Sequence, residues 1–351
     1  MSQTNGQKLL GATKTQAVYA SCAYLIRYIT GFVAEDGCVV VDKNGTTLYT
    51  DKRYIEAAKA AFVGTDVEAT LYNQAEVLNR LASYQSVGIS FRETSHVEFL
   101  ALDKAGVKTQ DIDAPLNVVM AVKNADELAS IAKACEIAED AFIELLPQIQ
   151  EGMTETQVAA LLEYNMRKRG GESIAFETIV AFGTHASVPH HETGDTKLCF
   201  GDEILMDFGC KINGYCADIT RTVLFGDDNK HEEFKKAYEC VLTAHDLVKE
   251  RLVGGMTAGE ADAIARDYLK SKGYGELFTH SLGHGIGLNV HEFPYLRPKA
   301  TDILTDGMVF SDEPGVYVEG KYGIRIEDTV TLENGKVKSF MNKTSKQLVI
   351  L

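Results

Sequence analysis

The chain has 351 residues, with 35 Lys+Arg against 50 Asp+Glu and a formal net charge of −15. This length suits two domains or one large domain with a sizeable core, and 45% apolar and 24% charged residues are typical of a globular protein. The acidic excess argues against nucleic acid or an anionic membrane as a partner, because both require a basic surface. No stretch approaches the roughly 20 apolar residues of a membrane span, and the segment MSQTNGQKLLGATK lacks the apolar core of a secretory signal.

The seven cysteines are odd in number and include no CxxC pair. We therefore expect buried, free thiols in a reducing compartment, the cytoplasm. A disulfide framework and a cysteine-based zinc site are both disfavoured.

Residues 1–122 alternate strand-like and helical patterns, which predicts a smaller N-terminal α/β domain. Two apolar runs flank Asn44-Gly45, a strong hairpin signal. Helical patterns cover residues 52–61 and 73–83. The net charge of this part is only −2, so most of the acidic excess lies further along the chain.

Residues 123–351 form the second predicted domain, and they contain a repeat. The triplet Gly-Met-Thr at 152–154 returns at 255–257, and each threonine can cap the N-terminus of a helix. A long helical pattern precedes each triplet, at 125–146 and 231–252. Predicted strands and clustered histidines follow both copies. We interpret this as a duplicated half-domain, in which two helices are followed by sheet.

Four carboxylates in the second domain indicate chemistry. Asp207 lies in the apolar run Ile-Leu-Met-Asp-Phe-Gly, and Asp218 lies in the segment predicted to return as the next strand of a hairpin. Glu313 and Glu327 repeat this arrangement on a second predicted hairpin. An ionised carboxylate in an apolar strand is costly unless it is paired or bound to a cation. Four of them at close range require a strong positive charge, for which a divalent metal is the natural candidate.

His284 lies in the glycine-rich segment HSLGHGIGLNVHE. One imidazole with four carboxylates is an oxygen-rich set that suits two Mn²⁺, Co²⁺ or Zn²⁺ ions. Two such ions can hold a bridging hydroxide and polarise a carbonyl, which is hydrolysis chemistry. Taken singly, Asp207 could end a hairpin, Glu313 could be a turn residue, Glu327 could be solvated and His284 could be a core histidine. Their ordered co-occurrence favours the metal site.

The segment at 280–292 resembles a motif of the proline peptidases, which comprise aminopeptidase P and the Xaa-Pro dipeptidase (prolidase). Four further segments match the remaining motifs of this family in order: MDFG at 206–209, ADITRT at 217–222, DEPG at 312–315 and GIRIED at 323–328. Two N-terminal segments also resemble the family: YLIRYITGF at 24–32 and LYTDKRYIEAA at 48–58. The resemblance therefore covers nearly the whole chain.

The resemblance implies a duplicated α/β "pita-bread" catalytic domain, a smaller N-terminal α/β domain and a homodimer. It implies two divalent metal ions per subunit, Mn²⁺ first, with Co²⁺ or Zn²⁺ as alternatives. By this resemblance, Asp207 and Asp218 would bind one ion. His284 and Glu313 would bind the other, with Asp218 and Glu327 bridging the two.

The resemblance also implies roles in catalysis. Glu313 would act as general base while a bridging hydroxide attacks the carbonyl before proline. His291 would stabilise the tetrahedral intermediate, and His190 would lie near the proline and assist proton transfer. The remaining implied site residues would bind substrate or orient ligands: His191, His280 and Arg325.

The function implied is hydrolysis of the Xaa-Pro bond in a peptide substrate, as an Xaa-Pro aminopeptidase. The alternative is an Xaa-Pro dipeptidase, which shares the same motifs. Methionine aminopeptidase is disfavoured by the large N-terminal domain, and creatinase by the complete metal set. A catalytically inactive, peptide-binding relative is the alternative from a different class. It is disfavoured because such a protein usually lacks some of the metal ligands, whereas the full set is present here.

Overall fold

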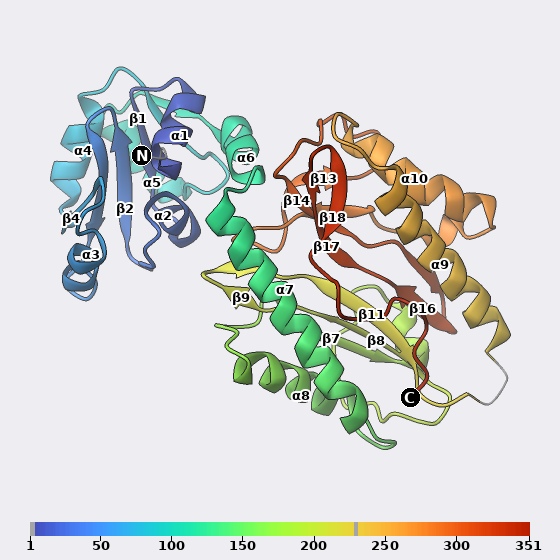
Figure 1. Ribbon diagram of the computed structural model, residues 1–351. Coiled ribbons are helices and arrows are strands. Elements are labelled where there is room, and N and C mark those ends of the chain that lie inside the picture. Colours follow the sequence, from blue (N-terminus) through green and yellow to red (C-terminus); the bar gives the residue numbers. More distant parts are fainter. Residues whose placement is uncertain (1–3, 228–230) are drawn as a thin grey trace. The chain divides into compact units, whose positions relative to one another are not determined.

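The structure is a computed structural model that describes residues 4–227 and 231–351 (Figure 1). The chain forms two compact units, Met1–Met120 and Ala121–Leu351. Within the described ranges, no helix combines the length and the apolar character needed to cross a bilayer.

The first unit contains one six-stranded sheet, in the order β4-β3-β2-β1-β5-β6, with helices between its strands. Strand β2 pairs antiparallel with β1 and β3, and the other pairs are parallel. The elements in chain order are α1 (Asn5–Thr13), β1 (Ala17–Ala20), α2 (Ala23–Thr30), β2 (Gly37–Asp42), β3 (Gly45–Thr50), α3 (Ile55–Ala61), β4 (Val67–Leu71), α4 (Gln74–Ala82), β5 (Val87–Ile89), α5 (His96–Lys104), β6 (Thr109–Asp111) and α6 (Asp113–Ala121).

The predicted hairpin in this unit is confirmed, with a shifted turn. Asp42 pairs with Gly45, so Lys43 and Asn44 form the turn and Gly45 begins β3. Gly45 has a φ of 144°, a conformation that glycine adopts without the steric cost of a side chain. The two helices predicted further along are α3 and α4, and α3 begins three residues later than expected.

The second unit consists of two halves with the same element order, a helix pair followed by strands. The first half contains α7 (Ala125–Leu145), η1 (Leu146–Gln148), α8 (Glu155–Lys168), β7 (Ile179–Phe182), η2 (Gly183–Ser187), β8 (Glu203–Phe208), β9 (Lys211–Ile212), β10 (Tyr215–Cys216) and β11 (Ile219–Leu224). The second half contains α9 (Glu232–Arg251), α10 (Ala258–Ser271), η3 (Gly275–Leu277), β12 (Gly283–Gly285), β13 (Glu292–Leu296), β14 (Val309–Asp312), β15 (Gly315–Val318), β16 (Tyr322–Arg325), β17 (Asp328–Glu333) and β18 (Lys336–Ser339).

The repeated Gly-Met-Thr triplets begin equivalent helices. Thr154 caps α8 and Thr257 caps α10, and each threonine hydroxyl accepts a hydrogen bond from the backbone N–H three residues on, at 3.1 Å. The side chains of Gln157 and Glu260 bond back to the cap N–H, completing two capping boxes. Helices α7 and α8 pack on one group of strands, and α9 and α10 on the other, each around its own hydrophobic core (Figure 1).

Contacts between β11 and the β16–β17 region join the two halves. The N–H of Glu327 donates to Thr220 O at 3.1 Å, and the Thr222 hydroxyl donates to Arg325 O at 3.0 Å. These bonds bring the sheet β11-β8-β7 against the second half, whose main sheet has the order β13-β12-β14-β17-β18. Residues far apart in the sequence therefore meet at this junction.

Candidate metal centre and active site

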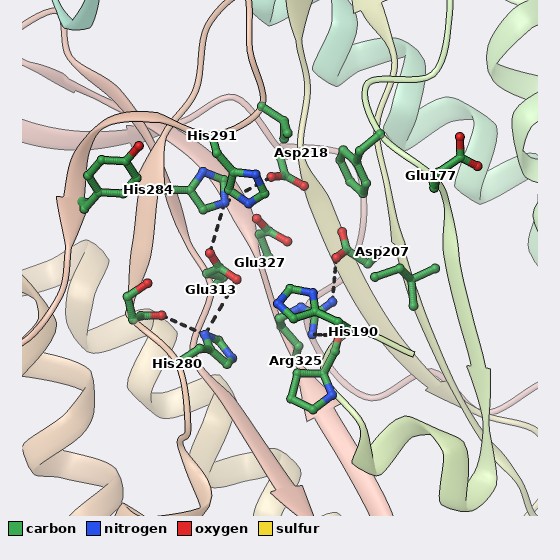
Figure 2. A pocket seen from close by; sticks show the side chains of 16 residues that line it. Glu177, His190, Asp207, Asp218, His280, His284, His291, Glu313, Arg325 and Glu327 are labelled. Carbon is green, nitrogen blue, oxygen red and sulfur yellow. Dashed lines mark hydrogen bonds and ion pairs between the residues drawn. The ribbon is translucent and has the colours of Figure 1, made fainter. Parts of the chain in front are cut away.

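Nine of the ten predicted site residues line one pocket of about 420 Å³ in the second unit (Figure 2). They are His190, Asp207, Asp218, His280, His284, His291, Glu313, Arg325 and Glu327. The pocket lies between the two halves, so each half contributes carboxylates and histidines. The tenth residue, His191, is not among the lining residues.

Asp207 and Asp218 come from adjoining segments of the first half. Asp207 lies in β8 opposite Thr220 of β11. Asp218 comes immediately before β11, and so lies outside the ladder in which we expected it. A Cβ at Gly209 would lie 1.9 Å from Ala217 O, so only glycine allows the two backbones to approach this closely. This approach places the two carboxylates in the same pocket.

Glu313 and Glu327 lie opposite each other in the second half. Glu313 connects β14 to β15 and Glu327 connects β16 to β17, and the ladders on the two sides keep the same register. Both acids therefore lie in the short gap between the β14–β17 ladder and the β15–β16 ladder. The Thr220 hydroxyl donates to Glu327 Oε2 at 2.6 Å, and the Ser311 hydroxyl donates to Glu313 Oε1 at 3.1 Å. These bonds hold each carboxylate by one oxygen.

His284 of β12 directs one ring nitrogen toward the acids. Its Nε2 lies 3.3 Å from Glu313 Oε1 and 3.6 Å from Asp218 Oδ2. Its Nδ1 lies 3.2 Å from Gly285 O, which assigns the proton to Nδ1 and leaves Nε2 free to coordinate. One ligand atom each from Asp218, His284 and Glu327 lies within 4.8 Å of the others. This spacing matches the binding of one cation by all three.

The carboxylates in the pocket require positive charge. Burial raises the pKa of Glu313 to about 8, and the negative charge of Asp207 contributes. Burial, followed by repulsion from the neighbouring carboxylates, raises the pKa of Asp218 and Glu327 well above the usual range. Asp207 Oδ1 and Glu327 Oε1 are buried without a hydrogen-bond partner among the described residues. Divalent cations would satisfy these oxygens and relieve the repulsion, so the residues fit a metal centre.

A hydrogen-bonded chain runs from Arg325 to His280. Arg325 Nη2 donates to Asp207 Oδ2 at 2.6 Å, and its Nη1 donates to the hydroxyl of Tyr317 at 2.8 Å. The Tyr317 hydroxyl lies 2.8 Å from His280 Nε2, while His280 Nδ1 lies 2.8 Å from Ser281 O. The partners assign Nδ1 of His280 as donor and Nε2 as acceptor. Sequence reasoning missed Tyr317, because a tyrosine in a strand gives no signal of this contact.

Two of the histidines in the pocket, His280 and His284, are held neutral by burial. Burial lowers the pKa of His280 and of His284 to about 3, and the charges of Arg325 and His291 respectively add to this. The rings of His284 and His291 have centroids 4.1 Å apart. A neutral imidazole can coordinate a metal or exchange a proton with substrate, whereas a charged imidazole cannot coordinate.

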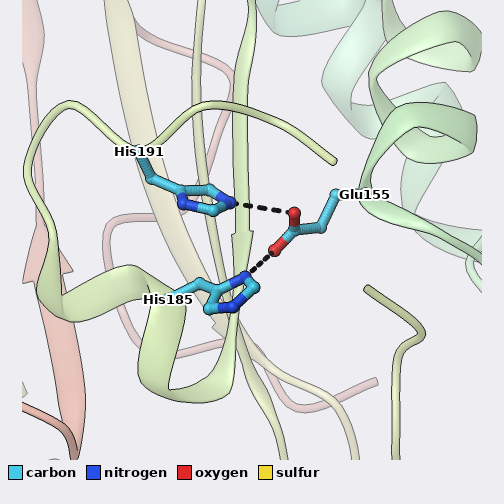
Figure 3. A group of neighbouring side chains, drawn as sticks. All are labelled: Glu155, His185 and His191. Carbon is cyan, nitrogen blue, oxygen red and sulfur yellow. Dashed lines mark hydrogen bonds and ion pairs between the residues drawn. The ribbon is translucent and has the colours of Figure 1, made fainter. Parts of the chain in front are cut away.

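The structure places His191 on a separate cluster. His191 Nε2 lies 2.9 Å from Glu155 Oε2, and His185 Nδ1 lies 2.9 Å from Glu155 Oε1 (Figure 3). We predicted His191 as a substrate-binding or ligand-orienting residue, and sequence reasoning assigned no role to Glu155 or His185. An acidic residue in the first turn of a helix ordinarily indicates a favourable interaction with the helix dipole, so the pattern does not predict these contacts.

Comparison with known proteins identifies the family. Residues 129–334 match the model of metallopeptidase family M24, and residues 4–120 match the creatinase/prolidase N-terminal domain. An Xaa-Pro dipeptidase of Pyrococcus furiosus is 37% identical over 315 residues, covering 89% of each chain. The crystal structure of an X-Pro aminopeptidase from Thermotoga maritima has a TM-score of 0.90 at 34% identity, covering 98% of this chain and 99% of that one. An Xaa-Pro dipeptidase from Bacillus anthracis has a TM-score of 0.93 at 32% identity, covering 99% of both chains.

These matches confirm the resemblance to the proline peptidases. They also confirm the predicted fold class, a smaller N-terminal α/β domain followed by a duplicated pita-bread domain. The M24 model matches more than half of the chain, and the relatives are similar over nearly all of it. The chain therefore belongs to metallopeptidase family M24, the family of the proline peptidases whose motifs it carries.

Proposed function

We propose that the protein is a dinuclear-metal-dependent Xaa-Pro dipeptidase, which hydrolyses the bond between the first residue of a dipeptide and its C-terminal proline. The observation that carries the proposal is one pocket that holds the four predicted carboxylate ligands and His284, with two buried carboxylate oxygens that have no hydrogen-bond partner among the described residues. The relatives that support the dipeptidase reading are the enzymes from Pyrococcus furiosus and Bacillus anthracis, both named Xaa-Pro dipeptidase.

The metal ligands we propose are Asp207, Asp218, His284, Glu313 and Glu327. Mn²⁺ is the proposed metal, with Co²⁺ or Zn²⁺ as alternatives, because the set is rich in oxygen and has one imidazole. Bound divalent ions lower the pKa of a water molecule and polarise the scissile carbonyl.

The other side chains bind the substrate and move protons. Glu313 accepts the proton of the attacking water as general base. His291, whose ring lies beside that of His284, donates a hydrogen bond to the oxygen of the tetrahedral intermediate. His190 lies on the proline side and assists proton transfer to the leaving nitrogen. His280 and Arg325, joined through Tyr317, orient the substrate and Asp207.

An Xaa-Pro aminopeptidase is the second candidate, and one observation favours it. Among the lining residues, the only Lys or Arg side chain is Arg325, which already pairs with Asp207. A dipeptide would place its C-terminal carboxylate inside the pocket, where a cation would have to bind it. A longer peptide would extend out of the pocket. The X-Pro aminopeptidase from Thermotoga maritima is also similar over nearly the whole chain.

A two-substrate assay tests the proposed function. Protein loaded with Mn²⁺, Co²⁺ or Zn²⁺ is given an Xaa-Pro dipeptide and the matching Xaa-Pro-Xaa tripeptide, with Xaa-Ala as a control for the proline requirement. Dipeptide cleavage with much slower tripeptide cleavage supports the dipeptidase. The reverse order supports the aminopeptidase. No hydrolysis of either peptide with any of the three metals contradicts both.

The assembly and the compartment are further parts of the proposal. We propose a homodimer, domains at 1–122 and 123–351, and a cytoplasmic location. The homodimer follows from the resemblance to the proline peptidases, and the location from the odd number of cysteines without a CxxC pair. Light scattering on the purified protein tests the homodimer, since a monomeric mass contradicts it.

A further inference from the structure

Glu155, His185 and His191 form a cluster at the N-terminus of α8, which we call the loop clamp (Figure 3). The Glu155 side chain is fully buried, with 0% exposure. Its carboxylate accepts four hydrogen bonds. Oε1 accepts from the Phe182 N–H at 3.0 Å and from His185 Nδ1 at 2.9 Å. Oε2 accepts from His191 Nε2 and from the Gly194 N–H, both at 2.9 Å.

The loop clamp is complete without a cation, although its ligand atoms lie within 4.8 Å of one another. An ionised carboxylate has about four acceptor positions, and Glu155 uses all of them. The histidine nitrogens that a metal would need are the ones that donate to Glu155. In the catalytic pocket, by contrast, Asp207 Oδ1 and Glu327 Oε1 have no partner among the described residues. Burial alone would raise the pKa of Glu155, but hydrogen bonds from His191, the Phe182 N–H and His185 outweigh it and lower the pKa.

The four donors belong to one segment that passes the catalytic pocket. Residues 182–194 leave β7, form η2 and return to the start of α8, so the clamp holds this loop on both sides of Pro189-His190. His190 lines the pocket (Figure 2), whereas His191, the next residue, is bonded to Glu155 (Figure 3). The position of His191 therefore constrains the position of His190.

A second contact holds the same loop from the pocket side. Arg325 Nη1 donates to Pro189 O at 3.4 Å, and a Cβ at Gly323 would lie 1.7 Å from Ala186 O. Strand β16 therefore packs closely against the loop. Glu155 is not among the residues that line the pocket, and it begins α8, a helix closed by a capping box.

We propose that Glu155 is a positioning residue for Xaa-Pro hydrolysis, because through His185 and His191 it fixes the loop that presents His190 to the substrate. This inference rests on the proposed function. It assigns His191 to the support of the loop instead of to the substrate. Fine alignment matters here, because a displacement of about 1 Å can reduce a rate about 100-fold.

The test uses two substitutions of His191 in the full-length, metal-loaded protein. His191→Phe keeps a ring but removes the donor, whereas His191→Gln places an amide N–H near the position of Nε2. We expect kcat for the Xaa-Pro dipeptide to fall about 10- to 100-fold in His191→Phe, with metal content unchanged, and to be largely restored in His191→Gln. His96→Phe, at an exposed histidine of α5, is the matched control and should leave kcat unchanged.

A double-mutant cycle separates positioning from general destabilisation. In a His190→Ala background, His191→Phe should cause no further loss of kcat, because the group that the clamp positions is absent. An equal loss in both backgrounds overturns the proposal, as does a His191→Gln variant no better than His191→Phe. Zn²⁺ binding beyond two equivalents that disappears in His191→Phe also overturns it, since the cluster would then be a cation site.

A measurement independent of activity keeps the clamp testable if the proposed function fails. Amide hydrogen exchange at Gly194 should be at least several-fold faster in His191→Phe than in the wild-type protein, because the loop opens more often. If the wild-type protein hydrolyses no Xaa-Pro substrate, the proposed function is contradicted. Unchanged exchange at Gly194 overturns the clamp in either case.

Discussion

Asp207 and Arg325, which both line the pocket, form an ion pair, with Arg325 Nη2 2.6 Å from Asp207 Oδ2. Both side chains are largely enclosed, at 14% and 5% exposure respectively. The second oxygen of Asp207 has no partner among the described residues. Asp207 can therefore keep its bond to the guanidinium through one oxygen and offer the other to a cation. The ion pair holds the carboxylate in place before any metal binds.

Arg325→Gln should destabilise the metal-free protein more than the metal-loaded protein. Breaking a buried ion pair costs about 3–5 kcal/mol, because it leaves the partner charge uncompensated. A bound cation supplies positive charge to Asp207, so the loss should be clearly smaller when metal is present. Urea unfolding with and without Mn²⁺ measures both free energies. Arg92→Gln, at an exposed arginine of the first unit, is the control. An equal loss in both states would contradict the ion-pair argument.

Glu327→Gln should change stability in opposite directions with and without metal. Burial and repulsion from Glu313 and Asp207 raise the pKa of Glu327, so removing its charge should stabilise the metal-free protein. The same change removes a proposed bridging ligand. Loss of a residue that only hydrogen-bonds to a metal ligand typically reduces activity about 10- to 100-fold, and we expect a larger reduction here. The rise in melting temperature on adding Mn²⁺ should also shrink.

Glu333→Gln is the matched control for Glu327, since Glu333 ends β17, the strand that follows Glu327, and is exposed. It should keep both the activity and the metal-induced rise in melting temperature. Asp218→Asn should behave like Glu327→Gln, because Asp218 is the other proposed bridging ligand. Near-normal turnover in either ligand variant, measured with saturating Mn²⁺, would refute the ligand assignment.

Local signals in the sequence predicted much of the fold. Thr154 and Thr257 are followed three residues later by Gln157 and Glu260, and both pairs form the capping boxes that begin equivalent helices. Such signals depend on hydrogen bonds within one turn of a helix, so they can be recognised without tertiary structure. The sequence also predicted that Glu313 and Glu327 lie opposite each other, because residues equally distant from the turn of a hairpin pair with each other.

Contacts between distant elements could not be predicted from these signals. The bond from His191 to Glu155 joins residues 36 apart, and its neighbour His190 turns into the pocket instead. No periodicity distinguishes the two histidines, because they lie in a turn and a loop. Asp218 lies just outside its strand, because the backbone at Gly209 ends the ladder. The sequence pattern indicates which residue types are present, whereas tertiary packing determines which way each side chain points.

His291→Ala should retain metal and lose rate. The His291 ring lies against the His284 ring at 4.1 Å between centroids, and among the described residues it makes no hydrogen bond or ion pair with the pocket carboxylates. Removing one donor to a tetrahedral intermediate typically costs 10²–10³ in kcat. Elemental analysis and kcat for the Xaa-Pro dipeptide measure the two effects. His284→Ala should instead lose metal, so equal metal loss in both variants would show that the role of His291 is misassigned.

Glu203 should make the free energy of unfolding depend on pH. Glu203 begins β8 and is 6% exposed, and its Oε1 is buried without a hydrogen-bond partner among the described residues. Burial raises its pKa from 4.5 to about 7. The folded protein therefore binds more protons than the unfolded chain between these pH values, so stability falls as pH rises from about 4.5 to 7. Above pH 7, this shift lowers the free energy of unfolding by about 3 kcal/mol.

Glu203→Gln should remove this dependence, because glutamine has nearly the same shape and no charge. The variant should match the wild-type protein near pH 4 and exceed it by up to about 3 kcal/mol near pH 8. Urea unfolding across this range, at one fixed metal concentration for all proteins, measures the difference. Glu319→Gln, at an exposed glutamate in the β15–β16 turn, should show the wild-type dependence. Parallel stability curves for Glu203→Gln and the wild-type protein would mean that Glu203 titrates normally in the folded state.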